Sequence, residues 1–265
     1  LMSWEDFISD LREQQCVTEG QLEGAVWSMW HEGRIISDYH GKYNNYGEAI
    51  IPKAAAELGR RKWTILGQIA RADPVALGLA AVLPATRAED VWRRELDHWE
   101  GVLDADETEP LPVIRAAIRW LRANPPPPAQ KVAVVHGDYR TGNFLYDTQG
   151  GIHGVLDWEM CHLGDPLEDL GWSFNPVWYF GQGKPGGLLP RDEAIAAWEA
   201  ASGLVAAPDA LKWWELFACV KGQAIWVSSA RTWLDGANRD PILVYPAWAL
   251  IDAQDRAALK VMGHL

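Results

Sequence analysis

Cysteine is scarce in this sequence, and the few that occur lie far apart. The three residues, Cys16, Cys161 and Cys219, show no CxxC spacing. An odd number of widely separated cysteines indicates neither a disulfide framework nor a zinc knuckle. We therefore expect buried or incidental thiols in the reducing environment of a cytoplasmic protein.

Basic side chains are also in short supply. Lysine and arginine number 24 against 36 aspartates and glutamates, which gives a formal net charge of −12. This balance argues against a nucleic-acid partner. It mildly favours a cationic small molecule as a ligand, although a solubilising acidic surface explains the charge at least as well.

Long apolar runs are missing too. No stretch is long enough to span a bilayer, and the first residues, LMSWEDF, are acidic and lack the basic and apolar regions of a secretory signal. We therefore expect no membrane partner and a cytoplasmic location. What the sequence does have is 265 residues, 48% of them hydrophobic, which is enough for a substantial core. Its 16 tryptophans are scattered through helical patterns, and we expect most of them to be packing residues.

Helical apolar spacing covers most of the chain. Pro52 is placed where a first-turn proline would stand, and the four prolines Pro125–Pro128 require an extended connector. The predicted helices are Trp4–Gln15, Lys53–Arg71, Ala88–Leu103, Val113–Ala123, Arg191–Ser202, Asp209–Trp233 and Ala247–Met262.

Strand-like segments occur only after the prolines. They are Lys131–Val135, Phe144–Tyr146 and Ile152–Trp158. The second and third are separated by a glycine-containing turn, which predicts a β-hairpin. The fold class is therefore α+β and mostly α.

The segment His136–Asn143, with the sequence HGDYRTGN, is the first candidate for chemistry. It supplies a carboxylate at Asp138 and an amide oxygen at Asn143, on a loop between two strands. Asp157 follows at the end of the next strand, and a hairpin would return it beside Asn143. Hard oxygen ligands of this kind suit Mg²⁺. The pattern predicts an oxygen-lined magnesium site.

The order HGDxxxxN, then DWE, then GDPxxDL resembles the aminoglycoside phosphotransferase and choline kinase superfamily. The shared motifs cover Val135–Leu170, and weaker similarity reaches back to Trp63. The resemblance implies a protein-kinase-like C-terminal lobe over residues 63–265, with a small β-hairpin at its catalytic face. Residues 1–62 are left as a helical N-terminal segment of unclear role.

The resemblance also implies roles for individual residues. Asp138 would be the catalytic base or hydroxyl-orienting group, and Asn143 and Asp157 would hold Mg²⁺ against the phosphates of ATP, the phosphoryl donor. Arg140 would steady the transferred phosphate, with a surface salt bridge as the equally weighted alternative.

Other residues would have supporting roles. His136 would hold the loop, and Glu159 would join the metal shell or the substrate side. Asp165 and Asp169 would brace the loop and cap the following helix. Lys221 is a candidate to line a substrate pocket.

The N-terminal β lobe of this superfamily, with its phosphate-binding lysine, has no recognisable counterpart in residues 1–62. We expect none of Lys42, Lys53 and Lys62 to be that lysine. The chain is then a fragment, a member whose first lobe is lost or supplied by another chain, or a degenerate kinase. In each case we expect poor activity from this polypeptide alone, because one side of the nucleotide would stay wet.

The hypothesis is an ATP- and magnesium-dependent phosphotransferase acting on a hydroxyl group of a small molecule, aminoglycoside-like or choline-like. A non-catalytic binding module is the alternative, and a metal-dependent phosphoesterase is a weaker one. The acceptor, the choice of ATP or GTP and the oligomeric state stay open.

Overall fold

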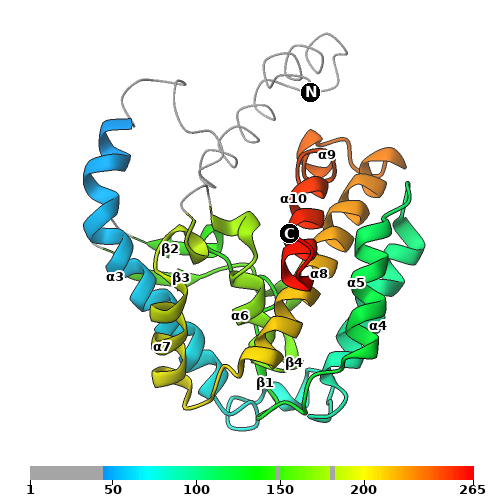
Figure 1. Cartoon of the computed structure of the whole chain (residues 1–265). Helices are drawn as coiled ribbons and strands as arrows, with labels where there is room; N and C mark the ends of the chain where they lie inside the picture. Colours follow the sequence, from blue (N-terminus) through cyan, green and yellow to red (C-terminus); the bar gives the residue numbers. More distant parts are fainter. Residues whose placement is uncertain (1–43, 147–149, 180–182) are drawn as a thin grey trace.

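The computed structural model describes residues 44–146, 150–179 and 183–265. The described part is mostly helical and carries two small antiparallel strand pairs (Figure 1). Its helices are α3 (Asn44–Arg71), α4 (Val91–Asp106), α5 (Pro112–Ala123), α6 (Leu167–Ser173), α7 (Arg191–Ser202), α8 (Pro208–Leu234), α9 (Tyr245–Ala249) and α10 (Ile251–Met262). The predicted helix Trp4–Gln15 and Lys42 lie outside the described residues.

Helix α3 differs from its prediction at its start. It begins at Asn44, so Pro52 lies inside the helix and not in its first turn. The first-turn reading was wrong, since the helix continues before Pro52 and a proline inside a helix removes one backbone hydrogen bond. The helix also runs without a break across the predicted domain boundary at residue 62, and that division stays a prediction.

The long helix α8 lies at the centre of the molecule. Figure 1 shows it between α6 on one side and α4 and α5 on the other, and α10 also packs on it. Residues are buried around its whole circumference, as expected of a central helix. Trp213 and Phe217 stack with ring centroids 5.7 Å apart, and Trp214 is fully buried beside them. The expectation that tryptophans mostly serve packing holds for these helices.

Helix α6 can approach α8 closely because of Gly171. A β-carbon at this position would come within 2.7 Å of the backbone of Trp214. Real side chains do not tolerate such a distance, so only glycine allows the two helices to pack this tightly. This contact fixes the position of α6 behind the loop that follows the first strand.

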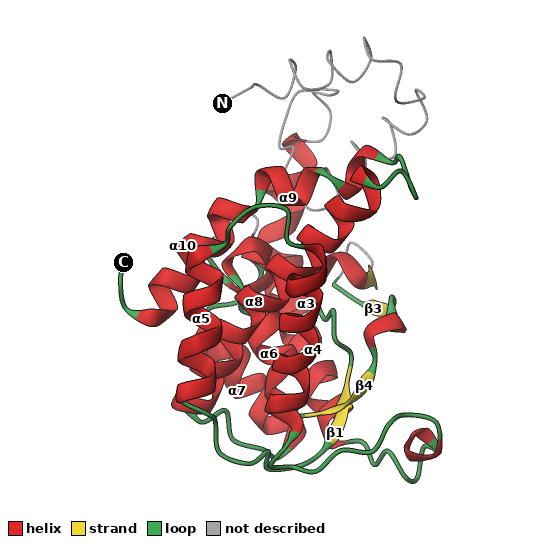
Figure 2. Cartoon of the chain, turned by 90° about the vertical axis from the view of Figure 1, so that its right-hand side faces the viewer, coloured by secondary structure: helices red, strands yellow, loops and turns green. Residues whose placement is uncertain are grey.

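Both strand pairs lie on one side of the helices (Figure 2). Strand β2 (Phe144–Tyr146) pairs with β3 (Ile152–Val155), which confirms the predicted hairpin. Strand β1 (Ala133–Val135) pairs with β4 (His162–Gly164). The sequence did not predict β4, since three residues reading His-Leu-Gly carry neither alternation nor β-branching.

The strand predicted over Ile152–Trp158 ends early, at Val155, and residues Trp158–Met160 form a 3-10 turn. The β1–β4 pair brings the loop after β1 next to the start of α6. Within the described residues, no helix combines the length and apolar character needed to cross a membrane.

Candidate active site

The loop from His136 to Asn143 is anchored from α6. The Asp169 carboxylate accepts hydrogen bonds from the backbone N–H of His136 at 2.6 Å and from that of Gly137 at 2.9 Å. Burial raises the pKa of Asp169, and the nearby His136, including its backbone N–H, opposes that rise. The prediction that Asp169 braces the loop is confirmed by these two bonds.

Gly137 adopts a positive φ of 87°. A β-carbon there would lie 2.6 Å from the carbonyl oxygen of Met160, so this turn requires glycine for both conformation and space.

His136 is fully buried and links the loop to the segment after β3. Its Nδ1 accepts a hydrogen bond from the backbone N–H of Asp138 at 3.1 Å, so the proton of the neutral ring lies on Nε2. Nε2 then donates to the carbonyl oxygen of Leu156 at 2.8 Å. These contacts are those of a scaffold residue, and a part in binding a cofactor stays a prediction.

Both carboxylate oxygens of Asp138 have partners. Oδ1 accepts a hydrogen bond from the indole Nε1 of Trp172 at 2.8 Å. Oδ2 accepts from Nδ2 of Asn143 at 2.8 Å and from Nε of Arg140 at 3.1 Å. The Asp138 side chain retains 16% exposure, so it is held in place and still reachable from solvent.

Asn143 is buried, and its amide nitrogen is turned towards Asp138. Nδ2 also donates to the Asp138 carbonyl oxygen at 2.9 Å. Because both partners are acceptors, the amide oxygen must face the other way. That oxygen accepts no hydrogen bond from the part of the chain that the structure describes, which leaves it available as a ligand for a hard cation.

Asp157 has a left-handed backbone with φ 69° and ψ 53°, and no other non-glycine residue in the described ranges has a positive φ. Strained conformations of this kind gather at functional sites. The backbone N–H of Leu156 donates to the carbonyl oxygen of Asn143 at 2.8 Å, so the hairpin returns the chain to Asn143 one residue before Asp157. Asp157 and Glu159 are both exposed, and their ligand roles stay predictions.

Lys62 lies beside this loop, and the expectation that it does not bind phosphate stays a prediction. Its side chain is fully buried, and Nζ donates to Oγ1 of Thr141 at 3.3 Å. Burial and, to a smaller extent, the Arg140 charge lower the pKa of Lys62 to about 7, with Asp138 opposing both. Only the folded structure reveals this position, because α3 and the loop are far apart in the sequence.

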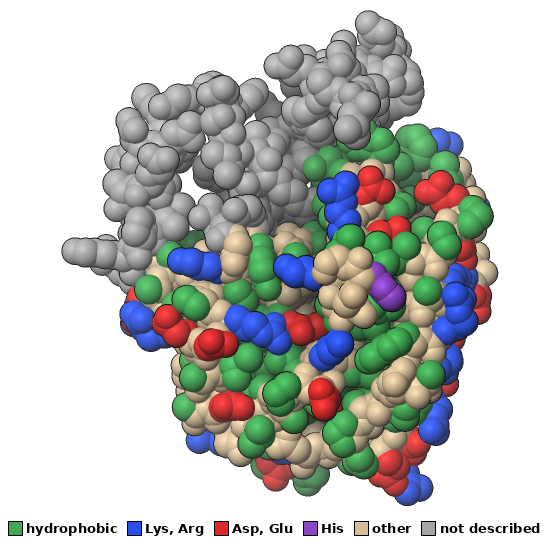
Figure 3. Space-filling view, in the orientation of Figure 1, with side chains coloured by type: hydrophobic (Ala, Val, Ile, Leu, Met, Phe, Trp, Pro, Cys, Tyr) green, Lys and Arg blue, Asp and Glu red, His purple; other side chains and the backbone are tan. Residues whose placement is uncertain are grey.

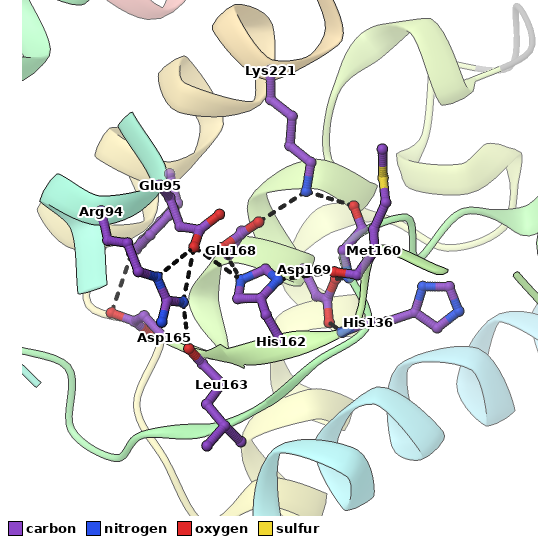
Figure 4. A network of polar contacts seen from close by, with 12 residues as sticks. Arg94, Glu95, His136, Met160, His162, Leu163, Asp165, Glu168, Asp169 and Lys221 are labelled. Atoms are coloured by element: carbon purple, nitrogen blue, oxygen red, sulfur yellow. Dashed lines mark hydrogen bonds and ion pairs between the residues drawn. The ribbon is translucent and has the colours of Figure 1, made fainter. Parts of the chain in front are cut away.

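A buried ion network lies behind the loop (Figure 4). Lys221 on α8 donates to the carbonyl oxygen of Gly137 at 2.6 Å and to Glu168 at 2.9 Å. His162 contacts Glu168 at 3.0 Å and Glu95 at 3.6 Å. Lys221 is 1% exposed and committed to these partners, so the suggestion that it lines a substrate pocket was wrong.

The charges of this network compensate one another. Burial favours the neutral forms, but the two acids raise the pKa of His162 to about 9, and Lys221 with His162 lowers that of Glu168 to about 2. Glu95, His162 and Glu168 could place one ligand atom each within 4.8 Å of one another. Lys221 pairs with Glu168 and Arg94 pairs with Glu95, so both acids already have cationic partners.

The sequence profile of the phosphotransferase enzyme family (APH) matches residues 17–214. The match begins within residues 1–62, the segment in which no β lobe is recognisable from the sequence.

Two curated relatives match parts of this chain. Acyl-CoA dehydrogenase family member 11 of Gallus gallus is 32% identical over 109 residues, covering 41% of this chain and 14% of that protein. Viomycin phosphotransferase of Streptomyces vinaceus is 32% identical over 127 residues, covering 45% of this chain and 41% of that protein. The chain thus matches a small part of the first and less than half of the second.

A solved structure supports the fold. The crystal structure of a Ralstonia eutropha protein, provisionally assigned as an aminoglycoside phosphotransferase, aligns with a TM-score of 0.65 at 20% identity. The alignment covers 79% of this chain and 67% of that one. The expected mostly helical, protein-kinase-like lobe is confirmed. Since the family profile matches most of the sequence, this chain belongs to the phosphotransferase enzyme family.

Proposed function

We propose that this protein transfers the terminal phosphoryl group of ATP, bound with Mg²⁺, to a hydroxyl group of a small molecule. The main support for this proposal is the position of the Asp138 carboxylate and its surroundings. Its carboxylate is fixed by three donors, is reachable from solvent and lies against an amide whose oxygen is free to bind a cation. A phosphotransferase needs a positioned carboxylate and a metal site together.

The residues present fit a magnesium ion. The Asn143 amide oxygen and the exposed Asp157 carboxylate would hold it, with Glu159 as a further candidate for the metal shell or the substrate side. When bound, Mg²⁺ neutralises charge on the phosphates. Asp138 receives the proton of the acceptor hydroxyl, and Arg140, which also lies 5.2 Å from the Trp178 ring, steadies the transferred group.

Exposed apolar side chains near the oxygen groups favour a nucleotide as the donor. Four large apolar side chains on the hairpin and the segment after it are 40% to 53% exposed. They are Leu145, Tyr146, Leu156 and Trp158. Exposed aromatic and aliphatic side chains of this kind provide a stacking surface for a base.

The acceptor must be identified by assay, and three observations suggest the compounds to test. The net charge of −12 favours a cation such as an aminoglycoside or a choline-like amine. In Figure 3 basic and acidic side chains lie side by side on the face shown, so charge alone does not mark an acceptor surface there. The names of the curated relatives add viomycin and acyl-CoA thioesters to the classes to be screened.

The test is a screen for acceptor-dependent ATP consumption with mass spectrometry of the products. The panel holds an aminoglycoside, choline, viomycin and a hydroxyacyl-CoA, with Mg²⁺ present or chelated. It is run on the 265-residue chain and on a form in which a β lobe is added before it. Magnesium-dependent product in either form supports the proposal, and no product from any acceptor in both forms contradicts it.

Two further measurements separate the alternatives. Isothermal titration of the 265-residue chain with Mg·ATP is expected to show weak binding, and micromolar affinity would overturn the expectation of poor activity. A generic phosphate ester hydrolysed without ATP would identify a phosphoesterase. Absence of any magnesium- or nucleotide-dependent thermal shift would identify a binding module that has lost its nucleotide.

A further inference from the structure

Trp172 directs its one polar atom at the proposed catalytic carboxylate. The side chain is 2% exposed, and its Nε1 donates to Oδ1 of Asp138 at 2.8 Å. By contrast, several other buried indoles in the described residues have no hydrogen-bond partner for Nε1, including those of Trp63, Trp178 and Trp198. A buried indole does not therefore acquire an acceptor automatically in this fold, and the bond from Trp172 needs its own explanation.

The surroundings of Trp172 keep its ring from turning. The ring packs against Trp178 with centroids 5.4 Å apart, and the Lys221 ammonium lies 5.4 Å from its centroid. Helix α6 is itself held close to α8 at Gly171 and is bonded to the loop through Asp169. The indole N–H is therefore a fixed donor whose direction is set by the core.

The hydrogen bonds of Asp138 distinguish its two oxygens. A carboxylate oxygen has two lone-pair positions. Oδ2 accepts from both Asn143 and Arg140, so its positions are filled. Among the described residues, Oδ1 accepts from Trp172 alone, which leaves one position open.

We propose that Trp172 is a positioning residue, whose N–H fixes the rotation of the Asp138 carboxylate so that the open position of Oδ1 faces the acceptor hydroxyl. This inference rests on the proposed function. In the step concerned, the hydroxyl proton passes to Oδ1 of Asp138, and the hydroxyl oxygen forms a bond to the terminal phosphorus. The bond from that phosphorus to the bridging oxygen breaks, and ADP leaves with the electron pair.

The kinetic test compares two tryptophan-to-phenylalanine variants. Trp172→Phe keeps an aromatic ring in the core and removes only the N–H and part of the ring. Trp198→Phe on α7 makes the same chemical change at a fully buried indole whose N–H has no partner, and it serves as the matched control.

We expect Trp172→Phe to lower kcat by between about 10- and 100-fold, the range for one lost hydrogen bond to a charged group. KM for ATP and for the acceptor should change by less than about threefold, because the N–H acts on the reacting step. The control should retain kcat. Thermal unfolding of both variants identifies any loss caused by instability.

A second test does not depend on turnover. In a ¹⁵N–¹H spectrum of the 265-residue chain, the Trp172 indole peak is identified by its loss in Trp172→Phe. We expect Asp138→Ala to shift this peak and to increase its hydrogen exchange, because the acceptor is gone. The Trp198 indole peak should not move.

The outcomes separate the inference from the proposed function. A reduced kcat with unchanged KM, together with an indole peak that responds to Asp138→Ala, supports the inference. An active wild type with an unchanged kcat in Trp172→Phe overturns the inference alone, as does an indole peak that ignores Asp138→Ala. Absence of turnover in both the 265-residue chain and the form with an added β lobe overturns the proposed function, and the inference then has no basis.

Discussion

The ammonium group of Lys221 donates a hydrogen bond to the carbonyl oxygen of Gly137 at 2.6 Å, one residue before Asp138. In the same loop, the Asp169 carboxylate accepts hydrogen bonds from the backbone N–H groups of His136 and Gly137. Donor and acceptor groups of the loop are thus both held by helices of the core. Because Lys221 also pairs with Glu168, the position of the loop is coupled to a buried ion network.

Replacing Lys221 with methionine should destabilise the protein. The variant leaves Glu168 buried with His162 as its remaining cationic partner and removes the donor to Gly137. Breaking a buried ion pair costs about 3–5 kcal/mol. Urea unfolding measures the loss, and Lys212→Met, at an exposed position on the same helix, should cost less than about 1 kcal/mol. Equal unfolding midpoints for the two variants would contradict the role of the network.

His162 should make stability fall as the pH rises from 6.5 to about 9. Its pKa is about 9 in the fold against 6.5 for an ordinary histidine, because Glu168 and Glu95 outweigh the effect of burial. The stabilisation is fully present below pH 6.5 and is lost as the pH rises through 9, up to about 3 kcal/mol in all. Unfolding free energies at a series of pH values should show a flatter profile for His162→Gln. A parallel profile would remove His162 from this role.

Lys62, in contrast to His162, should make stability rise as the pH rises from about 7 to 10.5. Its folded pKa of about 7 lies below the usual 10.5, so the unfolded chain binds more protons between these values. The Lys62 contribution to stability therefore rises with pH in that window, by up to about 1.4 kcal/mol per pH unit. Lys62→Met should be more stable than wild type at pH 7, with a gap that narrows towards pH 10.5. A gap independent of pH would show that Lys62 keeps an ordinary pKa.

Asp138→Ala should abolish turnover without unfolding the chain, measured in a form that shows activity. Loss of a general base lowers rates by about 10²- to 10⁴-fold. The three donors around Asp138 lose an acceptor, but the site is open enough for water to replace it. Circular dichroism checks that the variant stays folded, and single-turnover rates measure the loss of turnover. A variant with near wild-type kcat would remove Asp138 from the chemistry.

Asp157→Asn should weaken magnesium binding, since it replaces a charged ligand with a neutral one. Asparagine tolerates the left-handed backbone at this position, so the substitution tests the charge without added strain. The magnesium concentration at half of the thermal shift, with ATP present, should rise by about 10-fold or more. Glu159→Gln in the same assay shows whether Glu159 belongs to the metal shell. An unchanged requirement in Asp157→Asn would exclude Asp157 as a ligand.

Much of the local structure follows from sequence patterns. The apolar spacing of residues 88–103 predicts α4, and Val91, Leu96 and Leu103 on its buried face are 1% exposed or less. The hairpin and the loop carrying Asp138 and Asn143 were predicted because turn chemistry and strand patterns are short-range. The start of α3 and strand β4 were missed, since Pro52 favours a helix start and three residues are too few to show a strand pattern.

The helical framework, the hairpin and the order of the family motifs can be read from local sequence patterns. The side chains that surround Asp138 cannot be read in this way, because they come together only when the helices pack. Trp172 lies 34 residues from it, and Lys221 reaches the preceding glycine across 84 residues. Helical periodicity predicts that such residues are buried, but not what they face. Their partners are set by how α3, α6 and α8 pack on one another, because a hydrogen bond requires atoms within about 3 Å in the right direction.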